Sequence, residues 1–117
     1  ITSNNSKIEL SFFFSPTCPH CAQEKEFLKQ IKEKYPQIVI NQYNSFEKEN
    51  MVLLRKFYRD YSVSQEDQGW VPITFVGDKY FVGFNEQTGK EIESCLKECL
   101  GSGEGKISQE MKIPFLG

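Results

Sequence analysis

An apolar segment followed by two closely spaced cysteines occupies residues 8–21, which read IELSFFFSPTCPHC. The nearly continuous apolarity of residues 8–14 predicts a strand that is buried on both faces, as in the centre of a sheet. Residues 15–17 interrupt this strand. Pro19 suits the first turn of a helix, where the N–H that proline lacks would have no partner in any case. We therefore expect the cysteines where a central strand passes into a helix.

Helix and strand patterns alternate along the rest of the chain. Apolar residues recur at helical spacing in two further segments, and two short β-rich runs flank a turn at Gly77. Asn44 with Glu47, and Thr88 with Glu91, are typical of capping boxes at the starts of the second and third helices. The predicted elements are strands at residues 8–14, 38–43, 72–76 and 79–84, helices at residues 18–35, 45–61 and 88–101, and a polar loop at residues 62–69.

The resulting order, β-α-β-α-β-β-α, predicts an α/β fold. A βαβ unit requires parallel strands with a right-handed crossover, and the hairpin adds antiparallel strands. Layer packing then puts helices on both faces of a four-stranded mixed sheet. We expect one domain at residues 1–101, closed by a helix that ends at Gly101. Residues 102–117 begin with Gly and Ser and are interpreted as a linker and tail.

The composition of the 117 residues excludes several classes of protein. The 14 Lys and Arg residues are scattered and the net charge is −2, so no nucleic-acid footprint is expected. No apolar run approaches the ~20 residues of a membrane helix. One His and four Cys leave a narrow choice of metal ligands, and we expect no metal. We expect a monomer.

The spacing Cys18-Pro19-His20-Cys21 in a βαβ setting is typical of a redox-active pair. A helix N-terminus favours the thiolate of Cys18, and one helical turn brings Cys21 within reach of a disulfide. His20 would stabilise the same thiolate and make the disulfide a stronger oxidant. A structural disulfide or half of a zinc site remain as alternatives, but the spacing to the other cysteines fits no common zinc pattern.

A second candidate region is Trp70-Val71-Pro72. Pro72 opens the third predicted strand, and the bond before a proline is the kind in which a cis peptide is affordable. Such a bond would turn the backbone of Val71 outward, where it could pair with an extended substrate segment. Trp70 suits either the core or a surface that faces the substrate.

Cys95 and Cys99 lie four residues apart on the apolar stripe of the last predicted helix. Free cysteine behaves as a small buried hydrophobic residue, so we expect these two side chains to pack in the core. A second redox pair or an intermolecular link remains the alternative.

The motif at residues 12–21, the Val71-Pro72 pair before a hairpin and the Val82-Gly83 pair after it resemble the thioredoxin superfamily. The resemblance covers residues 8–101 and implies a thioredoxin fold with the cis-proline at position 72. The Pro-His dipeptide between the cysteines is similar to that of DsbA-type thiol oxidases. Thioredoxins carry a buried carboxylate six residues before the first cysteine, whereas this chain has Phe12; another carboxylate, such as Glu24, could substitute.

The tail sequence KIPFLG at residues 112–117 is similar to the junction in proteins that fuse a thioredoxin-like domain to a DsbD- or CcdA-like membrane electron carrier. The missing initiator Met permits a cleaved signal peptide. Together these features lead us to expect an extracytoplasmic domain, periplasmic or membrane-tethered and facing outside, with an attached or partner membrane carrier.

The sequence thus predicts a thiol–disulfide oxidoreductase that acts on protein thiols and disulfides. Cys18 is the expected nucleophile and Cys21 the resolving thiol, with Val71 and Pro72 on the opposite wall of the site. Pro19 and Trp70 are the other expected contacts with substrate. The redox group is the disulfide itself, so neither a metal nor a nucleotide cofactor is implied. The alternatives are an electron relay reduced by a membrane thiol carrier and a non-catalytic binding module with the same fold.

Overall fold

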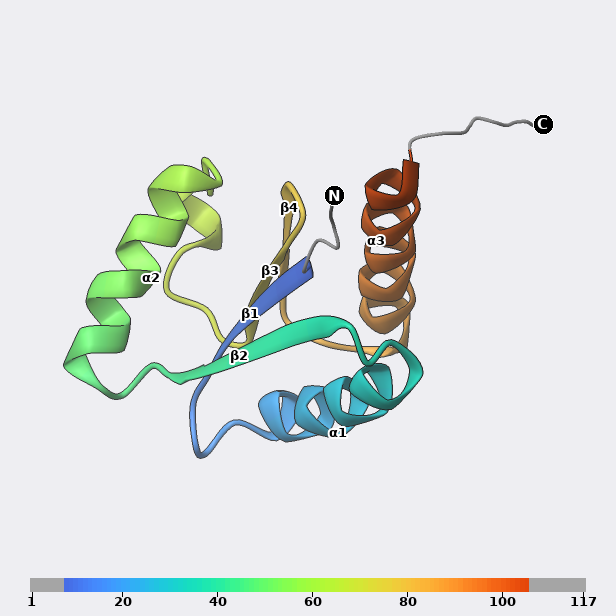
Figure 1. The fold of residues 1–117 in the computed structure, drawn as a ribbon. Coiled ribbons are helices and arrows are strands. Elements are labelled where there is room, and N and C mark those ends of the chain that lie inside the picture. The colour runs from blue at the N-terminus through green and yellow to red at the C-terminus, as the bar shows by residue number, and fades with distance from the viewer. Residues whose placement is uncertain (1–7, 106–117) are drawn as a thin grey trace.

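Residues 8–105 are the part of the chain that the computed structural model describes, and their helices and strands follow the predicted order (Figure 1). The elements are β1 (Ile8–Phe14), α1 (Pro19–Lys34), β2 (Ile38–Asn44), α2 (Lys48–Asp60), a short 3-10 turn η1 (Gln65–Asp67), β3 (Ile73–Val76), β4 (Lys79–Val82) and α3 (Glu86–Gly105).

The four strands form one sheet in the order β2-β1-β3-β4. β1 pairs in parallel with β2 and antiparallel with β3, and β3 pairs antiparallel with β4. This arrangement is the mixed sheet that the βαβ unit and the hairpin predict. β1 is a central strand, so the segment that leads to the cysteines is held by hydrogen bonds on both sides.

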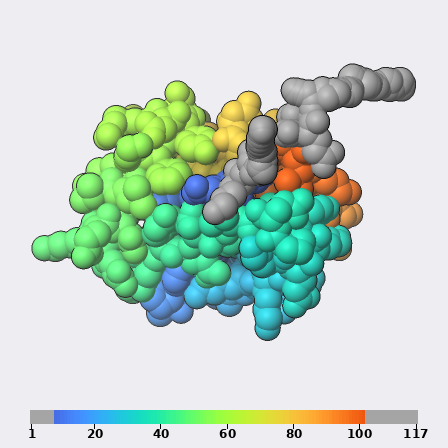
Figure 2. Space-filling model, in the orientation of Figure 1, coloured from blue at the N-terminus to red at the C-terminus, as the bar shows by residue number. Residues whose placement is uncertain are grey.

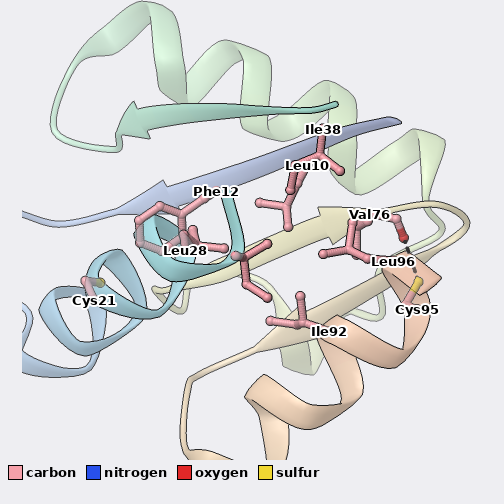
Figure 3. Packing of buried hydrophobic residues seen from close by; sticks show 10 residues of the cluster. Leu10, Phe12, Cys21, Leu28, Ile38, Val76, Ile92, Cys95 and Leu96 are labelled. Carbon is pink, nitrogen blue, oxygen red and sulfur yellow. Dashed lines mark hydrogen bonds between the residues drawn. The ribbon is translucent and has the colours of Figure 1, made fainter. Parts of the chain in front are cut away.

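Helices cover both faces of this sheet (Figure 1). Alternate side chains of a strand point to opposite faces, so Leu10 and Phe12 lie on one side of β1 and Phe13 on the other. The side of Leu10 and Phe12 holds the main core, to which α1 contributes Leu28 and α3 contributes Ile92 (Figure 3).

The opposite face is an aromatic layer under α2. Phe13 stands edge-on to Phe57 and to Phe75, with ring centroids 5.4 and 5.9 Å apart. Leu54 of α2 is buried in the same cluster. In the space-filling view, the green of α2 and the orange of α3 lie on opposite sides of the molecule (Figure 2).

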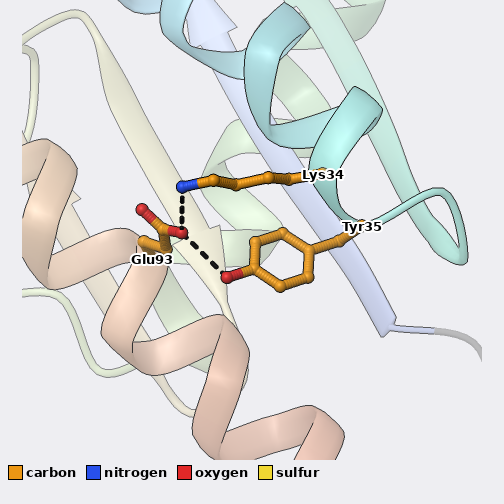
Figure 4. A network of polar contacts seen from close by, with 3 residues as sticks. All are labelled: Lys34, Tyr35 and Glu93. Carbon is orange, nitrogen blue, oxygen red and sulfur yellow. Dashed lines mark hydrogen bonds and ion pairs between the residues drawn. The ribbon is translucent and has the colours of Figure 1, made fainter.

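A polar network joins the end of α1 to α3 (Figure 4). The carboxylate of Glu93 accepts hydrogen bonds from Lys34 Nζ at 2.9 Å and from the Tyr35 hydroxyl at 2.8 Å. These two donors hold the pKa of Glu93 below its ordinary value. The network connects α3 to the C-terminal end of α1, which is the end farther from the cysteines.

The predicted start of the second helix is wrong by a few residues. α2 begins at Lys48, and its N-cap residue is Glu47, whose side chain makes no capping hydrogen bond. Asn44 is the last residue of β2, and its side chain accepts the backbone N–H of Phe46 at 2.9 Å. Asn44 therefore closes a turn between strand and helix and does not cap α2.

The predicted limits of the third helix are also wrong. α3 begins at Glu86, and the side chain of Asn85 accepts the backbone N–H of Thr88 at 2.8 Å, which makes Asn85 the capping residue. At the other end α3 continues through Gly101 to Gly105, and Gly101 does not have the positive φ of a glycine cap. The predicted tail motif at residues 112–117 lies outside the described residues.

Within residues 8–105, no helix combines the length and the apolar character that a membrane crossing would need.

Candidate active site

The two cysteines of the CPHC motif lie at the start of α1, directly after the central strand. β1 ends at Phe14, and a turn follows in which the backbone N–H of Cys18 donates to the carbonyl of Ser15 at 3.3 Å. Cys18 is the N-cap residue of α1, with extended backbone angles, and Pro19 fills the first turn as predicted. The buried strand β1 therefore leads to Cys18 at the N-terminal end of α1, where backbone N–H groups have no partner within the helix.

Cys18 occupies a place that suits a reactive thiolate. Its Sγ accepts the backbone N–H of Cys21 at 3.1 Å, and the first turn of α1 contains no acidic side chain. The partial positive charge of a helix N-terminus favours an anion at this position. Cys18 is half-buried, while Pro19 and His20 beside it are exposed. Of the two cysteine sulfurs, that of Cys18 is therefore the one nearer to solvent.

Cys21 lies in a different environment from Cys18, although one helical turn separates them. It is buried, with 1% of its surface exposed, and it belongs to the main core cluster. Burial raises the pKa of the Cys21 thiol to about 12, and the neighbouring Cys18 side chain adds to this shift. Both cysteines are free thiols in this structure.

The residues around Pro72 meet the CPHC motif from the other side. The Val71–Pro72 peptide bond is cis, and the Cys18 thiol lies 3.8 Å from the carbonyl oxygen of Val71. These residues are 53 positions apart in the chain. The fold therefore brings together Cys18, Cys21, Val71 and Pro72, the residues on which the predicted site depends.

Trp70 projects from the same segment and is 62% exposed. Its indole N–H donates to the carbonyl oxygen of Glu66 at 3.1 Å, which anchors the ring to the loop after α2. Of the two interpretations left open by the sequence, core or surface, the structure supports the surface.

Glu24 of α1 is the buried carboxylate nearest in sequence to the cysteine pair. The sequence offered Glu24 as a substitute for the carboxylate missing at position 12, and Glu24 is completely buried. One carboxylate oxygen accepts a hydrogen bond from the Thr74 hydroxyl of β3, and the other, Oε1, is buried without a partner. Burial raises the pKa of Glu24 to about 7, and the bond from Thr74 offsets part of this shift.

A spacing argument could have found Glu24. The buried residues of α1 are Cys21, Glu24, Leu28 and Ile31, a run with steps of three, four and three residues. This is the spacing of one helix face, so Glu24 shares the face of Cys21. The charge of the side chain argued for solvent, whereas its place in the run indicated the core.

Cys95 and Cys99 lie at the other end of β3. The Cys95 thiol is 3.5 Å from the carbonyl oxygen of Val76, the last residue of β3. Pro72 lies at the opposite end, directly before the first residue of β3. Cys95 is buried in the main core and Cys99 packs against it, as the apolar stripe predicts. Among residues 8–105, no three His, Cys, Asp or Glu side chains converge as a metal site would require.

The sequence matches no protein-family model and no curated protein. Solved structures do resemble it. A glutaredoxin, grx-1, from Archaeoglobus fulgidus is 27% identical, with 74% of this chain and 86% of that one covered and a TM-score of 0.54. Mitochondrial thioredoxin 3 from Saccharomyces cerevisiae, in its oxidized form, is 13% identical, with 80% of each chain covered and a TM-score of 0.58. Thioredoxin O2 from Arabidopsis thaliana, in its oxidized state, is 18% identical, with 78% of this chain and 73% of that one covered and a TM-score of 0.58. The chain therefore has the fold of the thioredoxin superfamily.

Proposed function

We propose that this protein is a thiol–disulfide oxidoreductase that exchanges a Cys18–Cys21 disulfide with protein thiols. One observation carries the proposal: the Cys18 sulfur sits at the N-cap of α1, accepts the Cys21 N–H at 3.1 Å and has the buried Cys21 one turn behind it. A thiolate that a substrate can reach, with a second thiol within one helical turn, is what two-step disulfide exchange requires. The thioredoxin and glutaredoxin neighbours support the same class of reaction.

In the reducing direction, the Cys18 thiolate attacks one sulfur of a substrate disulfide. A bond forms between Cys18 and that sulfur, and the second substrate sulfur leaves as a thiolate. The Cys21 sulfur, having lost its proton, then attacks Cys18 and releases the first substrate sulfur. The substrate gains two electrons and the Cys18–Cys21 pair loses them; oxidation of a substrate dithiol is the same sequence in reverse.

The segment at residues 70–72 is the proposed contact with the substrate backbone. The Val71 carbonyl lies 3.8 Å from the Cys18 sulfur, close enough for a polypeptide bound along Val71 to place its own sulfur at Cys18. The exposed Trp70 ring offers an adjoining apolar surface, which tyrosine and tryptophan commonly provide at protein interfaces. Pro19 and His20 form the exposed rim on the side of α1.

The direction of electron flow and the compartment are part of the proposal. The Pro-His dipeptide favours an oxidising, extracytoplasmic protein, because stabilisation of the Cys18 thiolate favours the reduced form and makes the disulfide an oxidant. The KIPFLG segment at residues 112–117 favours instead a relay that receives electrons from a membrane thiol carrier. The two candidates differ in the partner with which Cys18 forms its mixed disulfide.

A trapping experiment tests the proposal. Cys21→Ala removes the resolving thiol, so mixed disulfides at Cys18 accumulate and can be identified by mass spectrometry after non-reducing separation. The variants carry Cys95→Ala and Cys99→Ala as well, because Cys99 is only half-buried and could give unrelated adducts. The matched control adds Cys18→Ala and should trap nothing.

The identity of the trapped partner separates the candidates. Secreted proteins with disulfides support the oxidase, and a transmembrane thiol carrier supports the relay. If adducts form equally with and without Cys18, or a natural partner binds as well after Cys18→Ala with its function intact, the proposal fails and a non-catalytic binding module takes its place.

A further inference from the structure

Cys95 and Cys99 form a second pair of cysteines that the proposed exchange reaction does not use. The Cys95 thiol donates to the Val76 carbonyl at 3.5 Å, at the end of β3 opposite to Pro72 and the CPHC motif. Figure 3 shows Cys21 and Cys95 at opposite ends of the main core. What this pair binds is therefore independent of the reaction at the CPHC motif.

The sulfurs of the pair meet over the backbone of Gly77. A Cβ atom at Gly77 would lie 2.8 Å from the Cys99 sulfur and 3.4 Å from the Cys95 sulfur. Burial raises the pKa of the Cys95 thiol to about 11, and the neighbouring Cys99 side chain adds to this shift. Two thiols thus converge on one small space, which a side chain at position 77 would fill.

The spacing of the pair suits a metal ion between the sulfurs better than a disulfide. Both cysteines lie within α3, four residues apart. At this spacing the Cβ atoms of a regular helix are about 5–6 Å apart. A disulfide needs Cβ atoms about 3.5–4.5 Å apart, so α3 would have to distort to form one. An ion bonded to both sulfurs spans the longer gap and leaves the helix intact.

The number of ligands indicates which ion fits. Zinc takes four ligands, and hard cations take oxygen. Among residues 8–105, no three His, Cys, Asp or Glu side chains converge. Cu(I) is a soft ion that prefers thiolates, and two of them in a nearly linear arrangement satisfy it. The sequence alone gave no reason to expect a metal, because it does not show that the two thiols meet at Gly77.

The surroundings give a cation access to the pair and balance the charge of the product. Cys99 is half-buried, and Cys95 lines a surface hollow of about 310 Å³. The carboxylates of Glu91 and Glu98 line the same hollow, where they attract cations. Two thiolates and one Cu(I) carry a net negative charge. The Lys79 ammonium, also on this hollow, favours such an anion, since it lowers the pKa of Cys95 against the effect of burial.

We propose that Cys95 and Cys99 bind one Cu(I) ion between their sulfurs. Both S–H bonds break, the two protons pass to the solvent, and each sulfur forms one bond to copper. No electron is transferred, and the copper stays Cu(I). The proposal does not depend on the exchange reaction at Cys18.

Competition with bathocuproine disulfonate, a chromogenic chelator of Cu(I), tests the proposal. The reduced full chain carries Cys18→Ala and Cys21→Ala, because the CPHC thiols could also take Cu(I). Copper is kept as Cu(I) with ascorbate in the absence of oxygen. We expect this parent chain to bind one Cu(I), and X-ray absorption at the copper edge to show two sulfur ligands.

Single substitutions remove one ligand at a time from the parent chain. Cys99→Ala should weaken Cu(I) binding by about 10³-fold, because the second sulfur no longer holds the ion in place, and Cys95→Ala should do the same. The matched control, Ser94→Ala, changes a side chain that lines the same hollow. It should bind Cu(I) as the parent does.

Gly77→Ala tests the geometry with both thiols present. Its Cβ would displace the Cys99 sulfur, so we expect binding to weaken by about 10-fold. Gly69→Ala is the matched control, because Gly69 has φ +91° and a Cβ there would meet nothing within 4 Å. It introduces backbone strain of the same kind and should leave Cu(I) binding unchanged. Circular dichroism verifies that each variant is folded.

Two results would overturn the proposal. One is a parent chain that binds Cu(I) no more tightly than its folded Cys99→Ala variant. The other is one copper per two chains, which would mean that the ion bridges two molecules instead of the Cys95–Cys99 pair. Neither result bears on the exchange reaction, because these chains lack Cys18 and Cys21.

Discussion

Cys18 and Cys21 show how strongly the backbone position of a single residue sets its chemistry. Cys18 caps the helix and accepts a backbone N–H, whereas Cys21 points into the core with 1% of its surface exposed. The partial positive charge of the helix N-terminus lies beside the Cys18 sulfur, whereas burial raises the pKa of the Cys21 thiol to about 12. The order of attack proposed above follows from this difference.

His20 supports a prediction at the same scale. A positively charged or hydrogen-bonding imidazole beside Cys18 would stabilise its thiolate and therefore the reduced form. We expect His20→Ala to lower the reduction potential of the Cys18–Cys21 pair by about 30 mV, equivalent to ~1.4 kcal/mol for a two-electron couple. Equilibration in glutathione buffers of defined composition measures this value.

The exposed polar residue Gln23, also near the start of α1, provides the control for His20. Gln23→Ala should leave the potential within error of the wild type. A His20→Ala protein with an unchanged or higher potential would show that the ring has no part in stabilising the thiolate.

At the scale of elements, α1 does most to organise the site. Its N-terminus holds Cys18, its buried face carries Cys21 and Glu24, and the residues at its C-terminal end bind Glu93 of α3 (Figure 4). β3 meets the same helix through Thr74 and places the Val71 carbonyl near Cys18. One helix and one strand therefore position the parts of the site that carry chemistry.

The hairpin between β3 and β4 gives a prediction about packing. Gly77 has φ +62°, and a Cβ there would lie 2.8 Å from the sulfur of Cys99 and 3.4 Å from that of Cys95. Gly77→Ala should destabilise the protein by about 2 kcal/mol, from left-handed backbone strain together with this overlap. Urea denaturation followed by circular dichroism measures the change in the free energy of unfolding.

A double-variant cycle separates the two causes of this loss. In a Cys99→Ala background the nearest sulfur is absent, so Gly77→Ala should cost about 1 kcal/mol less than in the wild type. An equal cost in both backgrounds would mean that backbone strain alone accounts for the effect.

At the scale of the whole molecule, Glu24 links stability to pH. Its pKa rises from 4.5 to about 7 on burial. Below pH 4.5 the folded and unfolded chains both hold the proton, but between these values the unfolded chain loses it first. Ionisation therefore favours the unfolded chain, and the stability contributed by this site falls as the pH rises, with the loss complete above about pH 7.

We expect Glu24→Gln to remove this loss. The free energy of unfolding of the variant minus that of the wild type should increase by about 3 kcal/mol between pH 4 and pH 8. Denaturant titrations at a series of pH values measure the difference, and other titrating groups cancel between the two proteins. A difference that stays constant over this range would contradict a buried, proton-binding Glu24.

Local patterns along the chain determined much of the architecture. The apolar run at residues 8–14 coincides with β1, Pro19 lies in the first turn of α1, and the order of strands and helices is the predicted one. These features depend on residues within a few positions of one another: side-chain alternation, helical periodicity and the missing N–H of proline. The cysteine pair at the start of a helix follows from the same local information.

Tertiary structure alone decided the surroundings of the functional groups. The buried Glu24 accepts a hydrogen bond from Thr74 of β3, 50 residues later in the chain. The approach of Val71 to Cys18 likewise spans 53 residues. The helical spacing places Glu24 on the face of Cys21, but it contains no information about which strand will cover that face. The sequence by itself therefore determined the order of the elements and the place of the cysteine pair, and only the packing of distant segments decided the burial of Glu24 and the approach of Val71 to Cys18.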